Sequence, residues 1–361
     1  MPVVDTRRRS LQSRKEHKTL TRAFRPEPAR AAANPIKYDM TDENVKKICV
    51  IRLGGFGDVI LFLNAVKHKV RPLYPDARID FVVAKEFASL MEGCDFIDRA
   101  IFHDRSKGLG GAFSFMRFCM RLKAEKYDLV LDLHNNTRSR IMGAVSRPKR
   151  RIFDFPENRD EPDPQAVTSC KGVVFPGKRT PVWVSDSDAS FISSLRSEPE
   201  SLIVGLCLGG SWESKRWPSS HFICLGNELI EKRNATIILL GGPSDVATAN
   251  DVEKGLRGGK VINLAGKTSL STSIAATLIC SAIVSADSGI LHAAHLSGTP
   301  LVGLFGCTDH EKFGYSGPNA ASISAGLSCS PCHKPVCPLG SIECMAAISP
   351  QRVYSCLEAL T

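Results

Sequence analysis

Short apolar runs, rich in β-branched residues, alternate with stretches of helical periodicity along most of the chain. Runs of this length with few polar residues are typical of strands buried on both faces of a parallel sheet. The segments with this pattern are 48–51, 78–83, 100–102, 127–133, 202–208, 235–240, 261–264, 282–285 and 301–306. Helical spacing between several of them predicts alternating strands and helices, and therefore an α/β fold.

The alternation is interrupted over residues 147–184, which are Pro-rich, charged and weakly periodic. A new unit begins near residue 185, so the strands divide into two arrays of similar length. The 361 residues are enough for two ordinary α/β domains, each with its own core. We therefore expect two Rossmann-like domains, over 45–184 and 185–361, with a cleft between them.

The first strand ends at a loop with three glycines in four positions, and Asp58 closes this loop at the start of a helix. Strand-to-helix turns of this kind lie at the carboxyl edge of a parallel sheet, where open α/β proteins bind ligands. Asp58 there suits the removal of a proton from a substrate hydroxyl, or it serves only as the N-cap of the helix. The residues alone favour neither interpretation.

Glycine-rich turns also follow strands in the second half of the chain. Residues 209–218 combine glycines, hydroxyls and Lys215, a composition that suits a bound phosphate. The alternative is a solvated basic loop with Trp217 packed beneath it. A GxGxxG sequence with an acidic residue about 20 positions further on does not occur, which counts against NAD binding.

The net charge of +10 is concentrated at the N-terminus. Residues 1–38 hold ten Lys or Arg against three acidic residues, and thus carry +7 of it. We expect residues 1–44 to form a basic, disordered arm, with contact to anionic lipid headgroups as the second interpretation. Nucleic-acid binding is not expected, because Phe24 is the arm's only stacking residue before position 38.

Neither a secretory signal nor a transmembrane helix is predicted. The basic arm lacks an apolar core segment, and no run of about 18 uncharged apolar residues occurs. We therefore expect a cytoplasmic protein, with peripheral attachment to the inner face of the membrane as an alternative. Thirteen cysteines without an export signal then indicate mostly free thiols, four of which are predicted core residues: Cys49, Cys207, Cys224 and Cys280.

Four other cysteines near the C-terminus follow the pattern C-x₂-C-x₄-C-x₆-C. They are Cys329, Cys332, Cys337 and Cys344. The spacing resembles a small structural metal knuckle, so a structural zinc or iron ion is one prediction, and reduced thiols or a disulfide are the other. Two further candidate metal groups, the pair Asp186 and Asp188 and the pair His292 and His295, fit an N-cap and helix packing better.

Five short motifs together resemble the lipopolysaccharide heptosyltransferases, glycosyltransferase family 9, over residues 46–350. In order they are Gly57-Asp58-Val59, Lys215-Arg216-Trp217-Pro218, Leu240-Gly241-Gly242-Pro243, Asp287-Ser288-Gly289 with His292, and Leu304-Phe305-Gly306 with Thr308-Asp309. The resemblance implies the GT-B architecture, in which two Rossmann-like domains face each other. The acceptor would bind to 45–184 and the nucleotide-sugar to 185–361.

The resemblance also implies roles for individual residues. Asp58 matches the family's catalytic base, and Lys215 matches the lysine that reaches the donor phosphates. The residues implied as donor contacts are Ser211, Lys215, Asp245, Asp287, Ser288, Gly289 and His292. The acceptor contacts, on position only, are Lys85 and Arg138.

The activity implied by the resemblance is inverting transfer of a heptose from an ADP-sugar to a lipid-linked core saccharide, without a catalytic cofactor. The family commonly has serines ahead of its Gly-Asp-Val, whereas this chain has Gly54-Gly55-Phe56. A related GT-B transferase that uses another nucleotide-sugar is therefore an alternative. A non-catalytic nucleotide-sugar or glycan-binding module is a second alternative, which the presence of both Asp58 and Lys215 disfavours.

Overall fold

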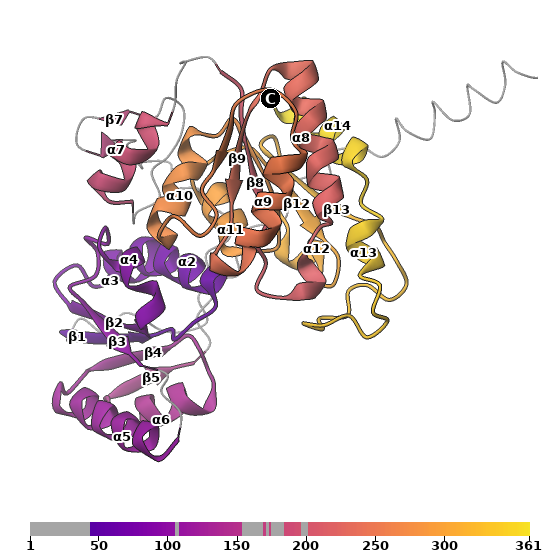
Figure 1. Ribbon diagram of the computed structural model, residues 1–361. Helices are drawn as coiled ribbons and strands as arrows, with labels where there is room; N and C mark the ends of the chain where they lie inside the picture. The colour runs from indigo at the N-terminus through magenta and orange to yellow at the C-terminus, as the bar shows by residue number, and fades with distance from the viewer. Residues whose placement is uncertain (1–43, 105–107, 154–168, 171–172, 175–183, 196–200) are drawn as a thin grey trace, which may run out of the picture. The chain divides into compact units, whose positions relative to one another are not determined.

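The computed structural model of the chain describes residues 44–104, 108–153, 169–170, 173–174, 184–195 and 201–361. Within these residues most strands belong to two parallel sheets (Figure 1). These residues form part of one compact unit, Pro35–Thr361. The predicted basic arm over residues 1–44 lies outside the described residues except for Asn44. Most of the Pro-rich segment over residues 147–184 also lies outside them.

The first sheet has the strand order β3-β2-β1-β4-β5. Its strands are β1 (Lys47–Ile51), β2 (Arg78–Ala84), β3 (Arg99–His103), β4 (Leu129–Asp132) and β5 (Arg150–Ile152). The helices beside it are α2 (Phe56–Ala65), η1 (Val66–Val70), α3 (Arg71–Leu73), η2 (Lys85–Phe87), α4 (Ala88–Met91), α5 (Gly108–Ala124) and α6 (Thr137–Val145). Ile48–Ile51 is fully buried, as a continuous apolar run in a central parallel strand predicts.

The second sheet has the strand order β10-β9-β8-β11-β12-β13. Its strands are β8 (Ile203–Cys207), β9 (Thr236–Leu240), β10 (Val261–Asn263), β11 (Ala282–Ala286), β12 (Leu301–Phe305) and β13 (Ala320–Ser324). The remaining elements are the pair β6 (Ser169–Cys170) and β7 (Val173–Val174), α7 (Asp186–Ser194), η3 (Glu213–Lys215), α8 (Ser219–Arg233), η4 (Pro243–Asp245), α9 (Val246–Gly255), α10 (Leu270–Ile279), α11 (Gly289–Leu296), α12 (His310–Phe313), α13 (Glu343–Ala346) and α14 (Pro350–Leu360).

Each sheet reverses its strand order beside its own first strand. In the first sheet β1 lies between β2 and β4, and in the second β8 lies between β9 and β11. The loops that leave two such strands diverge to opposite faces and leave a crevice at the carboxyl edge, where α/β proteins bind ligands. The candidate residues after β1, β4, β8 and β11 therefore belong to two such crevices.

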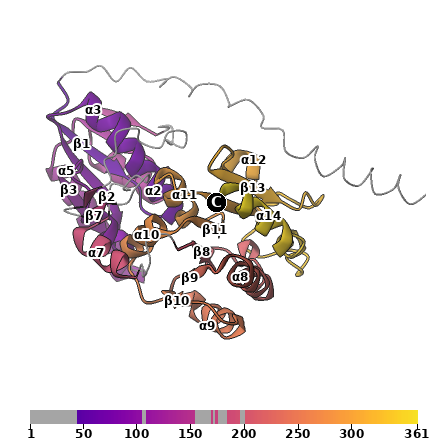
Figure 2. The same cartoon turned by 90° about the horizontal axis from the view of Figure 1, so that it is seen from above.

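Helices cover both faces of each sheet. In the first sheet α2 and α4 pack on one face while α5 and α6 pack on the other (Figure 1). In the second, the C-terminal helix α14 packs beside α8 (Figures 1 and 2). This helix closes the core around β12 and β13.

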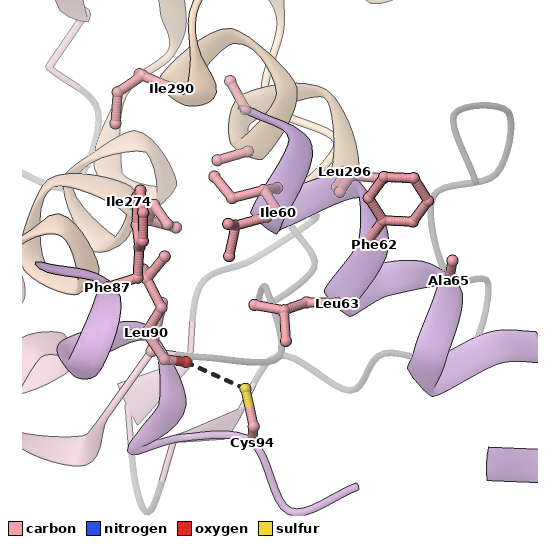
Figure 3. Close-up of a cluster of buried hydrophobic side chains, with 14 of the residues drawn as sticks. Ile60, Phe62, Leu63, Ala65, Phe87, Leu90, Cys94, Ile274, Ile290 and Leu296 are labelled. Carbon is pink, nitrogen blue, oxygen red and sulfur yellow. Dashed lines mark hydrogen bonds between the residues drawn. The ribbon is translucent and has the colours of Figure 1, made fainter. Parts of the chain in front are cut away.

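One hydrophobic cluster joins the two halves of the chain (Figure 3). Side chains of α2 and α4 pack there against side chains of α10 and α11. The labelled members from both halves are Ile60, Phe62, Leu63, Ala65, Phe87, Leu90, Cys94, Ile274, Ile290 and Leu296. Because the contact is apolar, burial of hydrophobic surface holds these helices of the two halves together.

The predicted strands are confirmed, although several elements were not identified from the sequence. These are the edge strands β5 and β13 and the helices α6, α8 and α9. Of the four predicted core cysteines, Cys49, Cys207 and Cys280 are buried. The prediction for Cys224 is wrong, because this residue lies on the solvent side of α8, opposite Phe222 and Leu225.

The acidic pair before α7 has a structural role at Asp188. Ser185 is the N-cap of α7, and the Asp188 carboxylate accepts hydrogen bonds from Ser271 Oγ and Thr272 Oγ1 of α10, both at 2.5 Å. Burial on its own raises the pKa of the Asp188 carboxyl, but the hydrogen bonds from Ser271, Thr272 and Ser185 outweigh it and hold the pKa below its usual value. Asp188 thus ties α7 to α10.

We expect Asp188→Ala to lower the free energy of unfolding by about 1–3 kcal/mol at neutral pH, because it removes hydrogen bonds to a charged group. A lowered native pKa stabilises the fold above the unfolded pKa of about 3.9 and ceases to do so as the pH falls through the native value. The difference between wild type and variant, measured by urea unfolding, should therefore shrink below about pH 4. The exposed neighbour Asp186→Ala is the matched control, and an equal loss there would contradict this role.

Candidate active site

A pocket of about 440 Å³ lies at the carboxyl edge of the first sheet. It is lined by residues at the end of β3, in the loops after β1 and β4, and in the first turns of α2 and α6: Arg52, Leu53, Gly54, Gly55, Asp58, His103, His134, Asn136 and Arg138. Two predicted site residues, Asp58 and Arg138, are thus brought together. Lys85 begins η2, is exposed and is not among the lining residues, so its acceptor role stays a prediction.

Asp58 is not the N-cap of α2. The N-cap is Gly55, whose φ of 85° favours glycine, and it makes no side-chain cap. A Cβ at Gly55 would also overlap the Asp58 carboxylate. Asp58 lies in the first helical turn, forms an ion pair with Arg52 and keeps a side chain that is 40% exposed. A carboxylate that is half-exposed in a pocket and does not cap its helix fits the functional interpretation.

Arg52 is a pocket residue that sequence reasoning missed. Its guanidinium donates to Leu133 O at 2.6 Å and to Gly54 O at 3.1 Å, in addition to its pair with Asp58. The side chain is only 13% exposed and lies over the ring of Phe62. It therefore fixes Asp58 between the ends of β1 and β4. A single arginine directly after a buried apolar run was the available signal.

The loop after β4 supplies the cationic side of the pocket. Buried Asp132 accepts the backbone N–H of Asn135 at 3.0 Å, and the side chain of Asn136 caps α6. This cap directs the first turn of α6, where Arg138 lies over the ring of Phe115 and 3.5 Å from His103 Nε2. Arginine and imidazole N–H groups beside a carboxylate suit an anionic ligand that carries a reacting hydroxyl.

A second set of predicted residues meets at the carboxyl edge of the second sheet. Lys215 Nζ, at the end of η3, lies 2.8 Å from Asp287 Oδ2 after β11 and 4.5 Å from the ring centroid of Trp212. The two charged side chains are only 12% and 11% exposed. A largely buried ammonium group at a topological switch point suits a phosphate, and Trp217, buried beneath the loop, holds it in place.

The N-terminus of α11 lies beside this ion pair. Ser288 caps the helix, with Leu291 N donating to its hydroxyl at 3.4 Å, and Gly289 is the first helical residue. His292 Nε2 lies 3.7 Å from Asp287 Oδ1, and its Nδ1 lies 2.7 Å from the hydroxyl of Tyr315. Backbone N–H groups at a helix N-terminus attract anions. Lys215, Asp287 and the N-terminus of α11 therefore suit a single phosphate group, and we call this set the phosphate corner.

Two glycines allow the N-terminal ends of α2 and α11 to touch. A Cβ at Gly57 would lie 2.6 Å from His292 Cδ2, and a Cβ at Gly289 would overlap the ring of Phe56. The residue before Asp58 therefore contacts the helix that follows Asp287. The turn that carries the candidate base and the helix that follows Asp287 are therefore neighbours.

Two other predicted donor residues differ in their surroundings. Ser211 is exposed in the loop after β8, next to the phosphate corner. Asp245 is buried, accepts the backbone N–H of Gly242 at 2.8 Å and pairs with Arg216 at 2.9 Å. These contacts brace the loops after β8 and β9, and a ribose contact by Asp245 stays a prediction.

The loop that carries Cys329, Cys332 and Cys337 packs against the turn that carries Lys215. Ser214, directly before Lys215, donates its backbone N–H to Pro335 O at 3.2 Å and its hydroxyl to Lys334 O at 2.5 Å. Its hydroxyl also lies 3.2 Å from Cys307 Sγ, and His333 N donates to Cys307 O at 2.8 Å. The loop therefore fixes the position of η3.

The structure does not support the predicted structural metal ion. Among the described residues, no group of three or more His, Cys, Asp or Glu side chains is placed to hold a metal. Cys329, Cys332, Cys337 and Cys344 are free thiols, and Cys344 is buried against Gly306 at the end of β12. Burial, and then the neighbouring thiols, raise the pKa of Cys344 to about 11. The spacing of the four cysteines thus predicted that the thiols lie near one another, but it did not predict whether they are arranged to bind a metal ion.

The comparisons with known proteins agree with this geometry. The family model described as "Glycosyltransferase family 9 (heptosyltransferase)" matches residues 181–343. Lipopolysaccharide heptosyltransferase 2 of Salmonella typhimurium is 29% identical over 289 residues, which cover 72% of this chain and 82% of the relative. Lipooligosaccharide heptosyltransferase 2 of Haemophilus ducreyi is 27% identical over 298 residues, covering 73% and 84%.

Two solved structures show the same fold. The ADP-heptose lipopolysaccharide heptosyltransferase II of E. coli aligns with a TM-score of 0.67 and 22% identity, over 87% of this chain and 98% of its own. A glycosyltransferase family 9 protein of Veillonella parvula aligns with a TM-score of 0.70 and 21% identity, over 91% and 99%. The architecture is therefore GT-B. Of the helices that the structure describes, none has the length and apolar content needed to cross a bilayer.

Proposed function

Because this chain belongs to glycosyltransferase family 9, the heptosyltransferases, we propose that it moves a heptose from an ADP-heptose donor to a sugar hydroxyl of the lipopolysaccharide inner core. The names of its relatives support the heptose and the lipopolysaccharide acceptor, and the name of the similar E. coli structure, an ADP-heptose heptosyltransferase, supports the donor. The observation that carries the proposal is the contact of the Asp58 turn with the helix beside Lys215 and Asp287. That contact supports a reaction in which Asp58 acts as the base while Lys215 binds the donor phosphates.

In the proposed reaction Asp58 accepts the proton of the acceptor hydroxyl while that oxygen attacks the anomeric carbon. The bond from this carbon to the nucleotide phosphate breaks at the same time, and a single displacement inverts the anomeric configuration. The pair with Arg52 supports this role, because it fixes the carboxylate at the edge of the pocket. A positioned base is typically worth about 10²–10⁴ in rate.

The departing ADP gathers negative charge as the glycosidic bond breaks. We propose that Lys215 and the backbone N–H groups of residues 288–290 stabilise this charge, so that the step needs no bridging metal ion. The low exposure of Lys215 supports a strong stabilisation of this charge, since the Coulomb energy between two charges is larger in a less polar medium. Arg138 and His103 would bind an anionic group of the acceptor core.

A related transferase with another nucleotide-sugar is the second candidate, favoured by the Gly54-Gly55-Phe56 loop. Incubation of the full chain with ADP-heptose and a core acceptor lacking that heptose, followed by mass spectrometry, separates the two. We expect one added heptosyl unit, an inverted anomeric centre by NMR and unchanged turnover in EDTA. Product with a different sugar donor alone would favour the second candidate, and donor binding without any product would favour a non-catalytic module.

A further inference from the structure

We propose that the outer surface of α5 and the adjoining surface of α6 dock on an anionic lipid bilayer. This surface consists of Phe113, Met116, Arg117, Met120 and Arg121 of α5 with Arg140 and Ile141 of α6, and we call it the α5–α6 face. The inference deepens the proposed function and rests on it in one respect, namely that the acceptor is lipid-linked. It concerns described residues and is independent of the N-terminal arm.

The helix α5 has two apolar sides, of which one is buried. Its inner side packs on the first sheet through Phe115, Phe118, Cys119 and Leu122. Its outer side exposes Phe113 to 75%, Met116 to 53% and Met120 to 50%. Spacings of three and four residues place these side chains in one stripe. Large apolar side chains that line up in water indicate a surface with a partner.

The surroundings of this stripe are basic. Arg117 and Arg121 are exposed and follow Met116 and Met120 directly. Residues 108–124 and 137–151 together hold nine Lys or Arg and no Asp or Glu. α5 contacts α6, which adds the exposed Arg140 and Ile141 to the same side of the sheet (Figure 1).

This combination fits a bilayer better than a protein partner. Phenylalanine and methionine can enter the acyl boundary, while arginine stems lie along the apolar region and keep their charge among phosphate headgroups. The uniform positive sign complements an anionic leaflet, which attracts each Lys or Arg near its surface. α5 thus has the composition of a helix that lies in the plane of a membrane surface.

The position of α5 relative to the pocket supports the same partner. Phe115, on the inner side, contacts His103 and lies under Arg138, and both of these line the pocket. The α5–α6 face and the pocket are therefore separated by about one helix diameter, roughly 10 Å. A saccharide that extends from a lipid in the docked leaflet could reach Asp58 while its acyl chains stay in the bilayer.

Co-sedimentation of the full chain with vesicles of phosphatidylglycerol and phosphatidylethanolamine tests the α5–α6 face. The triple variant Phe113→Ser, Met116→Gln, Met120→Gln should bind about tenfold more weakly than wild type, since its stripe no longer favours insertion. The double variant Arg117→Gln, Arg121→Gln should lose a similar factor at low salt and less at high salt. The matched control Phe191→Ser, Val336→Ser, Leu339→Gln removes exposed apolar side chains elsewhere and should bind as wild type.

A second measurement locates the helix directly. The fluorescence gained by Phe113→Trp should be quenched by brominated lipids, whereas the fluorescence gained by Phe191→Trp should not. Equal vesicle binding of wild type and the triple variant, or no quenching at 113, would overturn the proposal. Conversion of a wild-type dimer into a monomer by the triple variant, with unchanged vesicle binding, would assign the face to self-association and overturn it as well.

Turnover separates this inference from the proposed function. The triple variant should act on a water-soluble acceptor fragment as wild type does, and lose activity only on acceptor embedded in vesicles. Absence of wild-type turnover on any acceptor would contradict the proposed function while the vesicle and quenching results still decide the α5–α6 face.

Discussion

Asp58→Asn should reduce the turnover number about 10²–10⁴-fold while ADP binding stays unchanged. The amide has nearly the same shape as the carboxylate, so it leaves the pocket intact, but it cannot accept the proton of the attacking hydroxyl. Turnover is measured by release of ADP with saturating acceptor, and ADP affinity by titration calorimetry. A loss in the turnover number without a loss of donor affinity identifies a group that acts on the reacting atoms.

The control for this variant is another Asp–Arg pair in the same half of the chain. Asp98 pairs with Arg71 at 2.6 Å and is not among the residues that line the pocket. Asp98→Asn should therefore keep wild-type turnover. Turnover by Asp58→Asn above about one tenth of the wild-type value would remove Asp58 as the base.

Lys215→Ala should weaken ADP and ADP-heptose binding about 10–100-fold, because one charge-assisted contact to phosphate is lost. The variant also removes the ammonium group that lies 2.8 Å from Asp287, which adds repulsion between this carboxylate and the diphosphate. Calorimetry of the full chain with ADP measures the effect, and thermal unfolding verifies that the variant is folded. The loss should be smaller for AMP, which lacks the outer phosphate.

Lys232→Ala is the matched control for Lys215→Ala. Lys232 also pairs with a carboxylate, Glu228 at 2.6 Å, but it lies on the exposed side of α8. Its replacement should leave ADP affinity unchanged. Equal affinities of wild type and Lys215→Ala, in a folded variant, would mean that Lys215 only neutralises Asp287.

The site residues that could be predicted from the sequence are those in turns after buried strands. Asp58, Arg138, Lys215 and Asp287 all follow such strands, and parallel pairing brings the carboxyl ends of the strands to one edge. The resemblance to a family added roles to these positions. The two-sheet architecture followed from the same alternation of elements.

Other features depend on contacts between distant parts of the chain. Arg52 acts through Leu133 O, 81 residues away, and His103 reaches the pocket because β3 pairs beside β2. The role of Asp245 depends on its contacts with Gly242 and Arg216. The spacing of these residues in the sequence does not predict the contact with Arg216. Cysteine spacing likewise predicted a cluster but not a ligand geometry.

The anchoring of Ser214 to Lys334, 120 positions further along the chain, has a consequence for how donor affinity can vary. The loop at Lys334 and Pro335 holds the turn that carries Lys215, so we expect its length and conformation to set how far Lys215 projects toward the proposed diphosphate. Insertions or deletions in this loop should therefore change nucleotide affinity without replacing a proposed nucleotide contact. The affinity for the donor can therefore be altered by changes in a segment that contributes no group to the proposed reaction.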